Sequence, residues 1–203
     1  FDAYVDEIGN AVGVRGPDDA RRTLVLLGHI DTVPGEIPVR VEDGALYGRG
    51  AVDAKGSLCA FAEAAAGAPL PEGWRVVVVG AVGEEGDSRG AYHLRERFQP
   101  DACLIGEPSG ADRITLGYKG HVWLRYTLTR PAAHSSRPEP SGGALGAAFW
   151  QEVLAWCEQA NGSHERLFDQ VTPHLSRINT ESDGLLDTVR LTIGVRLPPR
   201  LAP

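Results

Sequence analysis

Imidazole and carboxylate side chains are concentrated in four short, glycine-containing turns of this sequence. The turns are Gly28-His29-Ile30-Asp31, Gly50-Ala51-Val52-Asp53, Gly83-Glu84-Glu85-Gly86 and Gly106-Glu107-Pro108. One imidazole and three carboxylates form a ligand mixture that Zn²⁺ or Co²⁺ accepts, and they belong to His29, Asp53, Glu85 and Glu107. One metal ion does not need three carboxylates, so the set predicts two ions that share Asp53.

Two further acids lie beside these candidate ligands. Asp31 follows His29 by two positions, which share a face in extended backbone, so its carboxylate can hold the imidazole in one tautomer. Glu84 adjoins Glu85, and adjacent carboxylates repel each other when both are ionised. A cation at Glu85 would relieve this repulsion and leave Glu84 free to accept a proton from water.

Each residue taken alone has a simpler interpretation. His29 could be a hydrogen-bonded core histidine, and the Glu84–Glu85 pair could be an exposed acidic turn. Asp53 could cap a helix that begins near Ala54. The four turns together favour the metal interpretation, because all of these residues then have a function in one site.

The segments around these turns predict the elements that position them. Apolar runs predict buried strands over 23–29, 74–81 and 101–105, with helices over 54–66 and 88–98. This alternation is typical of an α/β domain with a largely parallel sheet, which we assign to 1–110. Ligands gather at the carboxyl ends of such strands, and three of the turns lie there. We expect the glycines to let the backbone bend so that the side chains converge.

The remaining segments complete the expected architecture. A hairpin over 39–47, with Asp43-Gly44 at its centre, precedes the Asp53 turn. After about residue 111 the pattern changes to a strand over 114–129, a loop rich in Pro, Ser and Gly, a helix over 144–160, and strands over 171–179 and 188–197. These elements predict a small inserted α+β domain over 111–203.

Charge and composition exclude several classes of protein. The first 110 residues hold 18 acids and 10 bases, a net charge of −8, and residues 111–203 hold 9 acids and 10 bases, a net of +1. A basic stripe for nucleic acid is therefore absent. No apolar run is long enough to span a membrane. Three cysteines stand singly among apolar residues, which predicts reduced, buried thiols in a cytoplasmic protein.

The four motifs, in this order, resemble the metal sites of the co-catalytic zinc hydrolases. That family contains aminoacylases, acetylornithine deacetylases and succinyl-diaminopimelate desuccinylases. The matching segments are Gly28–Pro34, Gly48–Gly56, Gly83–Gly86 and Gly106–Ser109, and the resemblance covers essentially the whole chain. It implies a zinc-exopeptidase-like catalytic domain and an inserted lid domain that forms a homodimer.

The resemblance also implies a function for each residue. His29 and Glu107 would help to hold one Zn or Co ion, Glu85 would hold another, and Asp53 would bridge the two.

The resemblance makes Glu84 the general base and then the general acid, and it gives Asp31 the role of orienting His29. His134 resembles a lid histidine that reaches the active site of a partner subunit and stabilises the oxyanion; the alternative is an ordinary surface-loop histidine.

Within the family, the segments 106–110, 114–120, 168–171 and 196–200 are similar to hydrolases of lysine and arginine biosynthesis. These enzymes release lysine or ornithine from the terminal glutamate of a small acidic amino-group carrier protein. A deacylase or desuccinylase of small acyl-amino acids would share every metal residue, and a non-catalytic metal-binding dimerisation module is a third possibility. A basic patch would favour the carrier, and the candidates are Arg113, Lys119, Arg125, Arg130 and Arg137.

The sequence departs from the family pattern in one respect. The family takes a further metal-ligand histidine from a C-terminal stretch, and the histidines after Glu107 all fall in the lid-like segment: His121, His134, His164 and His174. The chain also begins with Phe1 and contains no methionine. We therefore expect a chain that is truncated at both ends and inactive by itself.

Overall fold

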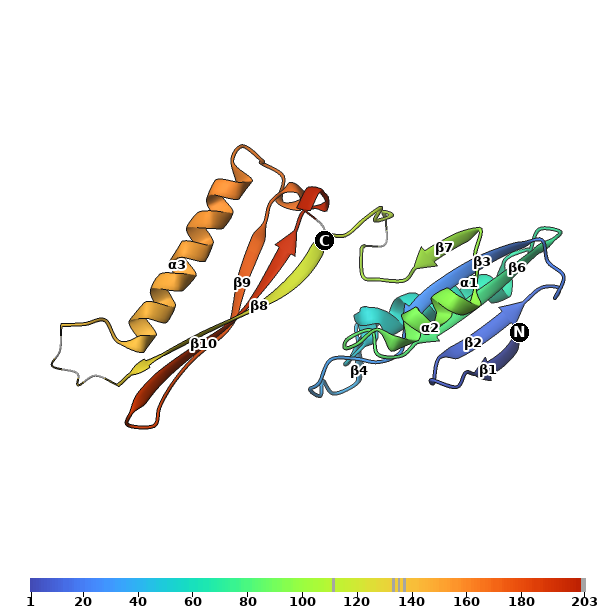
Figure 1. Cartoon of the computed structure of the whole chain (residues 1–203). Coiled ribbons are helices and arrows are strands. Elements are labelled where there is room, and N and C mark those ends of the chain that lie inside the picture. Colours follow the sequence, from blue (N-terminus) through green and yellow to red (C-terminus); the bar gives the residue numbers. More distant parts are fainter. Residues whose placement is uncertain (111, 133, 135, 137, 202–203) are drawn as a thin grey trace. The chain divides into compact units, whose positions relative to one another are not determined.

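The structure is a computed structural model, and it describes residues 1–110, 112–132, 134, 136 and 138–201. The backbone divides into two compact units, Phe1–Ile114 and Thr115–Pro203 (Figure 1). The boundary predicted from the sequence was residue 110. Among the described residues, no helix is long and apolar enough to cross a membrane.

The first unit contains a five-stranded sheet in the order β1-β2-β6-β3-β7. The three strands predicted from apolar runs, β3 (Arg22–His29), β6 (Trp74–Ala81) and β7 (Ala102–Ile105), are parallel, as expected. Two strands that were not predicted, β1 (Asp2–Val5) and β2 (Ala11–Arg15), add to β6 in antiparallel fashion. The sheet is therefore mixed rather than wholly parallel.

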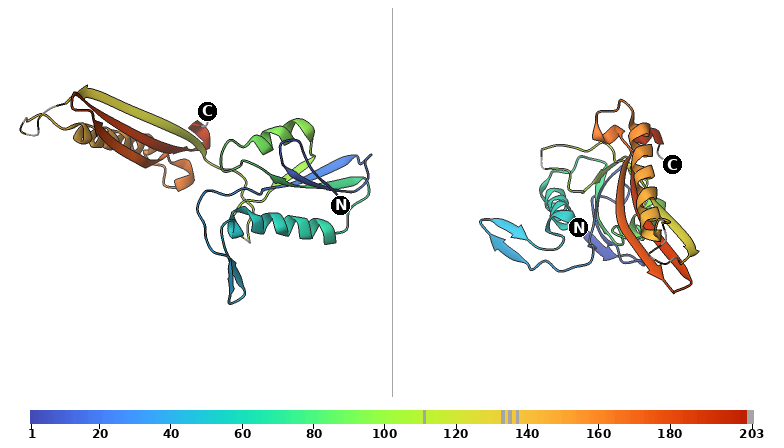
Figure 2. Two further views of the ribbon diagram at one scale, coloured as in Figure 1. Left: turned by 90° about the horizontal axis from the view of Figure 1, so that it is seen from below. Right: turned by 90° about the vertical axis from the view of Figure 1, so that its left-hand side faces the viewer.

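Helices cover both faces of this sheet, as Figure 2 shows. The helix α1 (Ser57–Gly67) packs on the face that includes Val76 and Val78, and α2 (Arg89–Arg97) packs on the face that includes Val77 and Val79. Because side chains alternate between the faces of a strand, burial on both sides requires a continuous apolar run. This requirement explains the four consecutive valines of β6.

Two predictions about burial are wrong. All four residues of β7 are exposed, because β7 is the edge strand of the described sheet. Cys103 on β7 and Cys59 on α1 are also exposed, and only Cys157 is buried. All three cysteines are free thiols, as predicted.

The predicted hairpin is confirmed. Strands β4 (Arg40–Glu42) and β5 (Ala45–Tyr47) pair in antiparallel fashion. Both residues of the turn between them have positive φ, 50° at Asp43 and 78° at Gly44. An Asp-Gly pair suits such a turn, because glycine and, less readily, aspartate adopt this conformation.

The second unit is a small α+β fold, as predicted. Its sheet has the order β8-β10-β9, formed by β8 (Gly120–Pro131), β10 (Leu186–Leu197) and β9 (Thr172–Ser182). The helix α3 (Gly142–Asn161) begins where the Ser141 hydroxyl accepts a hydrogen bond from Ala144 N–H at 3.2 Å. β8 begins at Gly120 rather than at Ile114, so the first part of the predicted strand is irregular.

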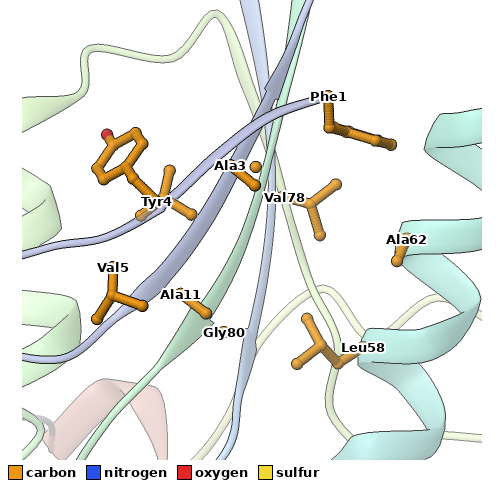
Figure 3. A pocket seen from close by; sticks show the side chains of 11 residues that line it. Phe1, Ala3, Tyr4, Val5, Ala11, Leu58, Ala62, Val78 and Gly80 are labelled. Atoms are coloured by element: carbon orange, nitrogen blue, oxygen red, sulfur yellow. The ribbon is translucent and has the colours of Figure 1, made fainter.

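An apolar hollow of about 530 Å³ lies in the first unit, between β1, β6 and α1 (Figure 3). Its lining includes Phe1, Val78 and Leu58, and Tyr4 contributes the single polar side-chain group, a hydroxyl. It offers no group suited to acid–base or metal chemistry at neutral pH. The candidate metal ligands lie instead at the strand ends.

Candidate metal centre

The carboxyl ends of β3, β6 and β7 meet at one edge of the first unit's sheet. His29 is the last residue of β3, Glu84 follows β6, and Glu107 follows β7. Backbone hydrogen bonds extend the register past the strands, from Ile30 N–H to Ala81 O at 2.9 Å and from Gly106 N–H to Leu27 O at 2.7 Å. Residues distant in sequence are thereby brought to one place, as the parallel arrangement predicted.

Some glycines of these turns bend the backbone, as expected, and others admit the helix α1. A Cβ on Gly106 would lie 2.7 Å from Phe61 Cε2, and a Cβ on Gly28 would lie 3.2 Å from Leu58 Cβ. Both contacts are with α1, so these glycines allow the helix to pack closely on the strand ends. Among the glycines next to the candidate ligands, Gly83 has a positive φ, 75°, and its backbone turns the chain into Glu84.

Asp53 reaches the site from an irregular turn. The segment Ala51–Gly56 contains a distorted helical turn in which Asp53 has extended dihedral angles, φ −114° and ψ 100°. The helix α1 begins after it, at Ser57, and no side chain caps that helix. The helix-cap interpretation of Asp53 is therefore wrong, as is the predicted helix start at Ala54, and the carboxylate is available to His29.

His29 is 1% exposed, and both of its ring nitrogens are hydrogen-bonded. Nδ1 lies 3.1 Å from the backbone carbonyl oxygen of Asp31, and Nε2 lies 3.0 Å from Asp53 Oδ1. A carbonyl oxygen only accepts hydrogen bonds, so Nδ1 is the protonated nitrogen. In the neutral ring Nε2 then presents a lone pair to another lone pair on Asp53, an arrangement that requires a proton or a metal cation between them.

Asp31 contacts both the histidine and the glutamate loop. Its backbone carbonyl, rather than its carboxylate, makes the short contact with His29; the carboxylate lies 3.6 Å from Nδ1. The carboxylate oxygens instead accept hydrogen bonds from the N–H groups of Glu84 at 3.2 Å and Glu85 at 3.1 Å. Burial alone would raise the pKa of Asp31, but these two hydrogen bonds, its own backbone N–H and the charge of His29 together lower the pKa.

Two overlapping sets of side chains could each hold a metal ion. In one set, ligand atoms of His29, Asp53 and Glu107 lie within 4.8 Å of one another, and in the other, those of His29, Glu84 and Glu85 do. The first set matches the ligands expected for one ion. The second places both glutamates of the predicted pair at the same histidine.

Burial and the neighbouring carboxylates shift the pKa values of His29, Glu84 and Glu107. Burial alone would lower the pKa of His29, but the hydrogen bonds with Asp53 and Asp31 and the charges of Glu84 and Glu107 together raise the pKa. Burial raises the pKa of Glu84, and the charges of Glu85 and Asp53 add to this effect while His29 opposes it. Burial and the charge of Glu84 raise the pKa of Glu107. Each shift reflects carboxylates held close together, a cost that a divalent cation would remove.

The donor set therefore fits a metal ion. It combines an imidazole, oriented by a hydrogen bond from its second nitrogen, with carboxylates, which are the ligands and the supporting contact found at zinc sites. Ligands of neighbouring positions on tetrahedral zinc are about 3.3 Å apart, given bonds of about 2.0 Å, and the 3.0 Å between His29 and Asp53 is close to this value.

Comparison with known proteins places this geometry in a family. Residues 25–199 match peptidase family M20/M25/M40. The chain belongs to that family. The match begins in β3 and includes every strand end described above.

Similar sequences carry more specific names. The chain is 45% identical over its whole length to the [LysW]-lysine hydrolase of Deinococcus radiodurans, and it spans 58% of that protein. It is 37% identical, again over its whole length, to a putative [LysW]-lysine/[LysW]-ornithine hydrolase of Thermococcus kodakarensis, of which it spans 54%. The chain thus spans little more than half the length of these relatives.

Solved structures of two peptidases share the fold. A tripeptidase of Staphylococcus aureus aligns with 98% of this chain and 57% of its own at a TM-score of 0.63 and 20% identity. Human carnosine dipeptidase 1 aligns with 95% of this chain and 57% of its own at a TM-score of 0.56 and 16% identity. At these identities the likeness concerns the fold alone.

The first unit also contains a buried polar cluster that the sequence did not predict. Asn10 is fully buried in the turn between β1 and β2, and its Nδ2 donates to Asp6 Oδ2 at 2.9 Å. Asn10 Oδ1 accepts from Val82 N–H at 2.9 Å, and Nδ2 lies 3.3 Å from Gly90 O. Val82 and Gly90 flank the loop that carries Glu84 and Glu85. The polar run between two short strands, Asp6-Glu7-Ile8-Gly9-Asn10, was the available signal.

His134 belongs to the second unit and is exposed. Its Nδ1 lies 2.8 Å from Ser136 Oγ, and Ser136 N–H donates to the same nitrogen at 3.3 Å. The neighbouring residues 133, 135 and 137 lie outside the described residues.

Proposed function

We propose that the protein to which this chain belongs is a metal-dependent amide hydrolase that releases lysine, or ornithine, from the terminal glutamate of an amino-group carrier protein. The observation that carries the proposal is the cluster of His29, Asp53 and Glu107 beside Glu84 and Glu85, within an M20 chain that resembles [LysW]-lysine hydrolase along its whole length. The carrier would be the macromolecular substrate, and the reaction would belong to cytoplasmic amino-acid biosynthesis.

Two divalent ions, Zn²⁺ or Co²⁺, would be held by these residues. His29 and Glu107 would bind one ion, Glu85 the second, and the Asp53 carboxylate both. When bound, the ions supply Lewis acidity, which polarises the amide carbonyl and makes water a stronger acid. Asp31 would keep His29 and the glutamate loop in place through its carbonyl and carboxylate contacts.

Glu84 would carry the proton of the reaction. Its pKa is raised by burial and by the neighbouring acids, which suits a group that must first accept a proton and then release it. The carboxylate would take a proton from the attacking water and deliver it to the departing amine. His134 of a partner subunit, in a homodimer formed through the second unit, would hydrogen-bond the negative charge that develops on the amide oxygen.

Two other functions were considered from the sequence. A deacylase of small acyl-amino acids would use the same ligands, and the names of the similar proteins favour the carrier substrate over it. A non-catalytic metal-binding module would not need Glu84, because Glu84 adds repulsion without being required as a ligand of the first set.

The first experiment combines metal binding with product release. The protein used would be extended to the full length of its relatives. Co²⁺ stoichiometry would be measured by calorimetry for the wild type, Glu84→Gln, Glu85→Gln and the exposed control Glu72→Gln. Lysine release from the lysine-loaded carrier and ornithine release from N-acetylornithine would be assayed in parallel. We expect two ions in the wild type, retained metal without lysine release in Glu84→Gln, and lost metal in Glu85→Gln. A wild type that binds no Co²⁺ would refute the hydrolase proposal.

A further inference from the structure

The two faces of the second unit's sheet differ in chemistry. One face is covered by α3: the ring of Phe149 stacks on Tyr126 with centroids 3.8 Å apart, and Val189 and Leu191 are buried there. Gly146 of α3 brings the helix close enough that a Cβ on it would lie 2.6 Å from Val189 Cγ1. This face is the core of the unit.

Strand register identifies the residues of the opposite face. Residues paired directly across an antiparallel sheet point to the same side, and their sequence neighbours point to the other. Tyr126 pairs with Leu191 on the core face, so Arg125, paired with Thr192, points away from α3. Thr192 pairs in turn with Arg177, and Arg196 pairs with both His121 and Thr172.

Basic residues are strongly segregated to this open side. Residues 115–203 contain nine Lys and Arg and eight Asp and Glu. Among the described residues, which leave out Arg137, five of the eight bases belong to the open side, and one of the eight acids, Glu181, does. We call this side the basic face, and it consists of Lys119, Trp123, Arg125, Arg177, Arg190 and Arg196.

Little on the basic face neutralises these charges. Glu181 Oε2 lies 2.6 Å from Arg190 Nη1, which satisfies one of the five. Within the part of the chain that the structure describes, Arg125, Arg177 and Arg196 make no ion pair. Lys119 donates from Nζ to Thr172 Oγ1 at 2.6 Å and to the Leu167 carbonyl at 3.0 Å, contacts that leave its charge uncompensated.

An aromatic platform lies among these bases. Trp123 is 54% exposed, and its ring centroid lies 4.8 Å from that of His121. A Cβ on Gly194 would lie 3.1 Å from Trp123 and 3.0 Å from His121, so both rings lie over the glycine. Exposed Trp with unpaired Arg is the composition found at the centres of protein–protein interfaces.

Arg113 and Arg130, two other basic candidates from the sequence, already have partners. Arg113 donates a hydrogen bond to Asp112 at 3.0 Å. Arg130 donates a hydrogen bond to the Pro140 carbonyl, and its guanidinium lies 3.6 Å from the Glu139 carboxylate. Arg137 lies outside the described residues.

We propose that the basic face docks an acidic segment of a partner protein. The identity of that partner rests on the proposed function, under which it is the acidic carrier that presents the lysine. Unpaired guanidinium groups match carboxylates in charge and in hydrogen-bonding geometry. A nucleic acid would offer negative charge to the same groups, so it is included as an outcome of the test below.

The docking test uses labelled poly-L-glutamate as the probe and fluorescence anisotropy as the readout. The variant Arg125→Glu/Arg177→Glu alters the basic face. The control Arg40→Glu/Arg166→Glu makes the same change in net charge at side chains that are 54% and 80% exposed elsewhere. Circular dichroism would establish that each variant folds, and Arg125→Gln/Arg177→Gln offers a milder replacement.

We expect affinity for poly-L-glutamate to fall by about tenfold or more in the face variant, and to fall with added salt, while the control stays within about threefold. Equal losses in both variants would show that net charge alone attracts the probe and would overturn the proposal. Oligothymidylate bound as tightly as poly-L-glutamate would overturn it in favour of a nucleic-acid surface. A wild type that binds poly-L-glutamate through the face but binds no metal and releases no lysine would refute the proposed function and leave the docking face intact.

Discussion

Asp31 hydrogen-bonds the backbone of Glu84: one carboxylate oxygen accepts from the Glu84 N–H at 3.2 Å, and the other accepts from the Glu85 N–H at 3.1 Å. The end of β3 is thereby connected to the glutamate loop after β6.

Asp31→Asn would replace one acceptor with an NH₂ group that faces an N–H. We expect Co²⁺ affinity, measured by calorimetry, to fall by about tenfold or more. Asp87→Asn, in the same loop but directed at Arg89, is the control and should change affinity by less than about twofold. Unchanged affinity in Asp31→Asn would refute this role.

Asn10 connects the two ends of that loop, and its removal should loosen it. Asn10→Ala leaves the Val82 N–H and a buried Asp6 oxygen without their partner. We expect unfolding free energy in urea to fall by about 1–3 kcal/mol, and hydrogen exchange of amides 83–90 to accelerate. Asn179→Ala, which removes an exposed contact with Glu181, should alter neither. Stability lost without faster exchange in the loop would mean that Asn10 supports only the fold.

Gly106 allows α1 to contact the end of β7. In Gly106→Ala the new Cβ would lie 2.7 Å from Phe61 Cε2, and overpacking of this kind costs about 1–3 kcal/mol. Thermal unfolding would measure the loss. Phe61→Leu in the same chain should recover part of it by removing the ring. Gly67→Ala, where nothing lies within 4 Å, is the control and should be neutral or slightly stabilising. A Gly106→Ala protein as stable as the wild type would contradict the close approach.

The Asp6 carboxylate should make stability depend on pH. Burial alone would raise its pKa, but hydrogen bonds from Asn10 and Ile8, together with the charge of His93, lower the pKa below its ordinary value of 3.8. As pH falls through this range, the unfolded chain takes up a proton before the native protein does, so the contribution of Asp6 to stability is lost.

The difference in unfolding free energy between wild type and Asp6→Asn should therefore be larger at about pH 7 than at about pH 3. Urea titrations at the two pH values measure it, and Asp2→Asn, at an exposed position, is the control. A difference that grows as the solution is acidified would show that the carboxylate is not stabilised in the native protein.

Much of the architecture could be predicted from local patterns. The limits of β6 match the apolar run 74–81, because burial on both faces leaves no polar position inside such a strand. The Asp43-Gly44 turn was equally local. The start of α1 was not, because alanine-rich sequence permits a helix from residue 54 while the Asp53 turn interrupts it. β1 and β2 were missed, since strands of four and five residues carry too little periodicity.

The sequence by itself determined which chemical groups end the strands: His29 after one apolar run, the Glu84–Glu85 pair after the next, and Glu107 after the third. Residue type and the ends of apolar runs are local properties, so they survive without coordinates. Only the tertiary structure decided the partners of those groups. Asp31 binds the loop 53 residues later, and Asn10 binds Val82 across 72 residues. Strand order and register set such distances, and neither is encoded in the residues near either end.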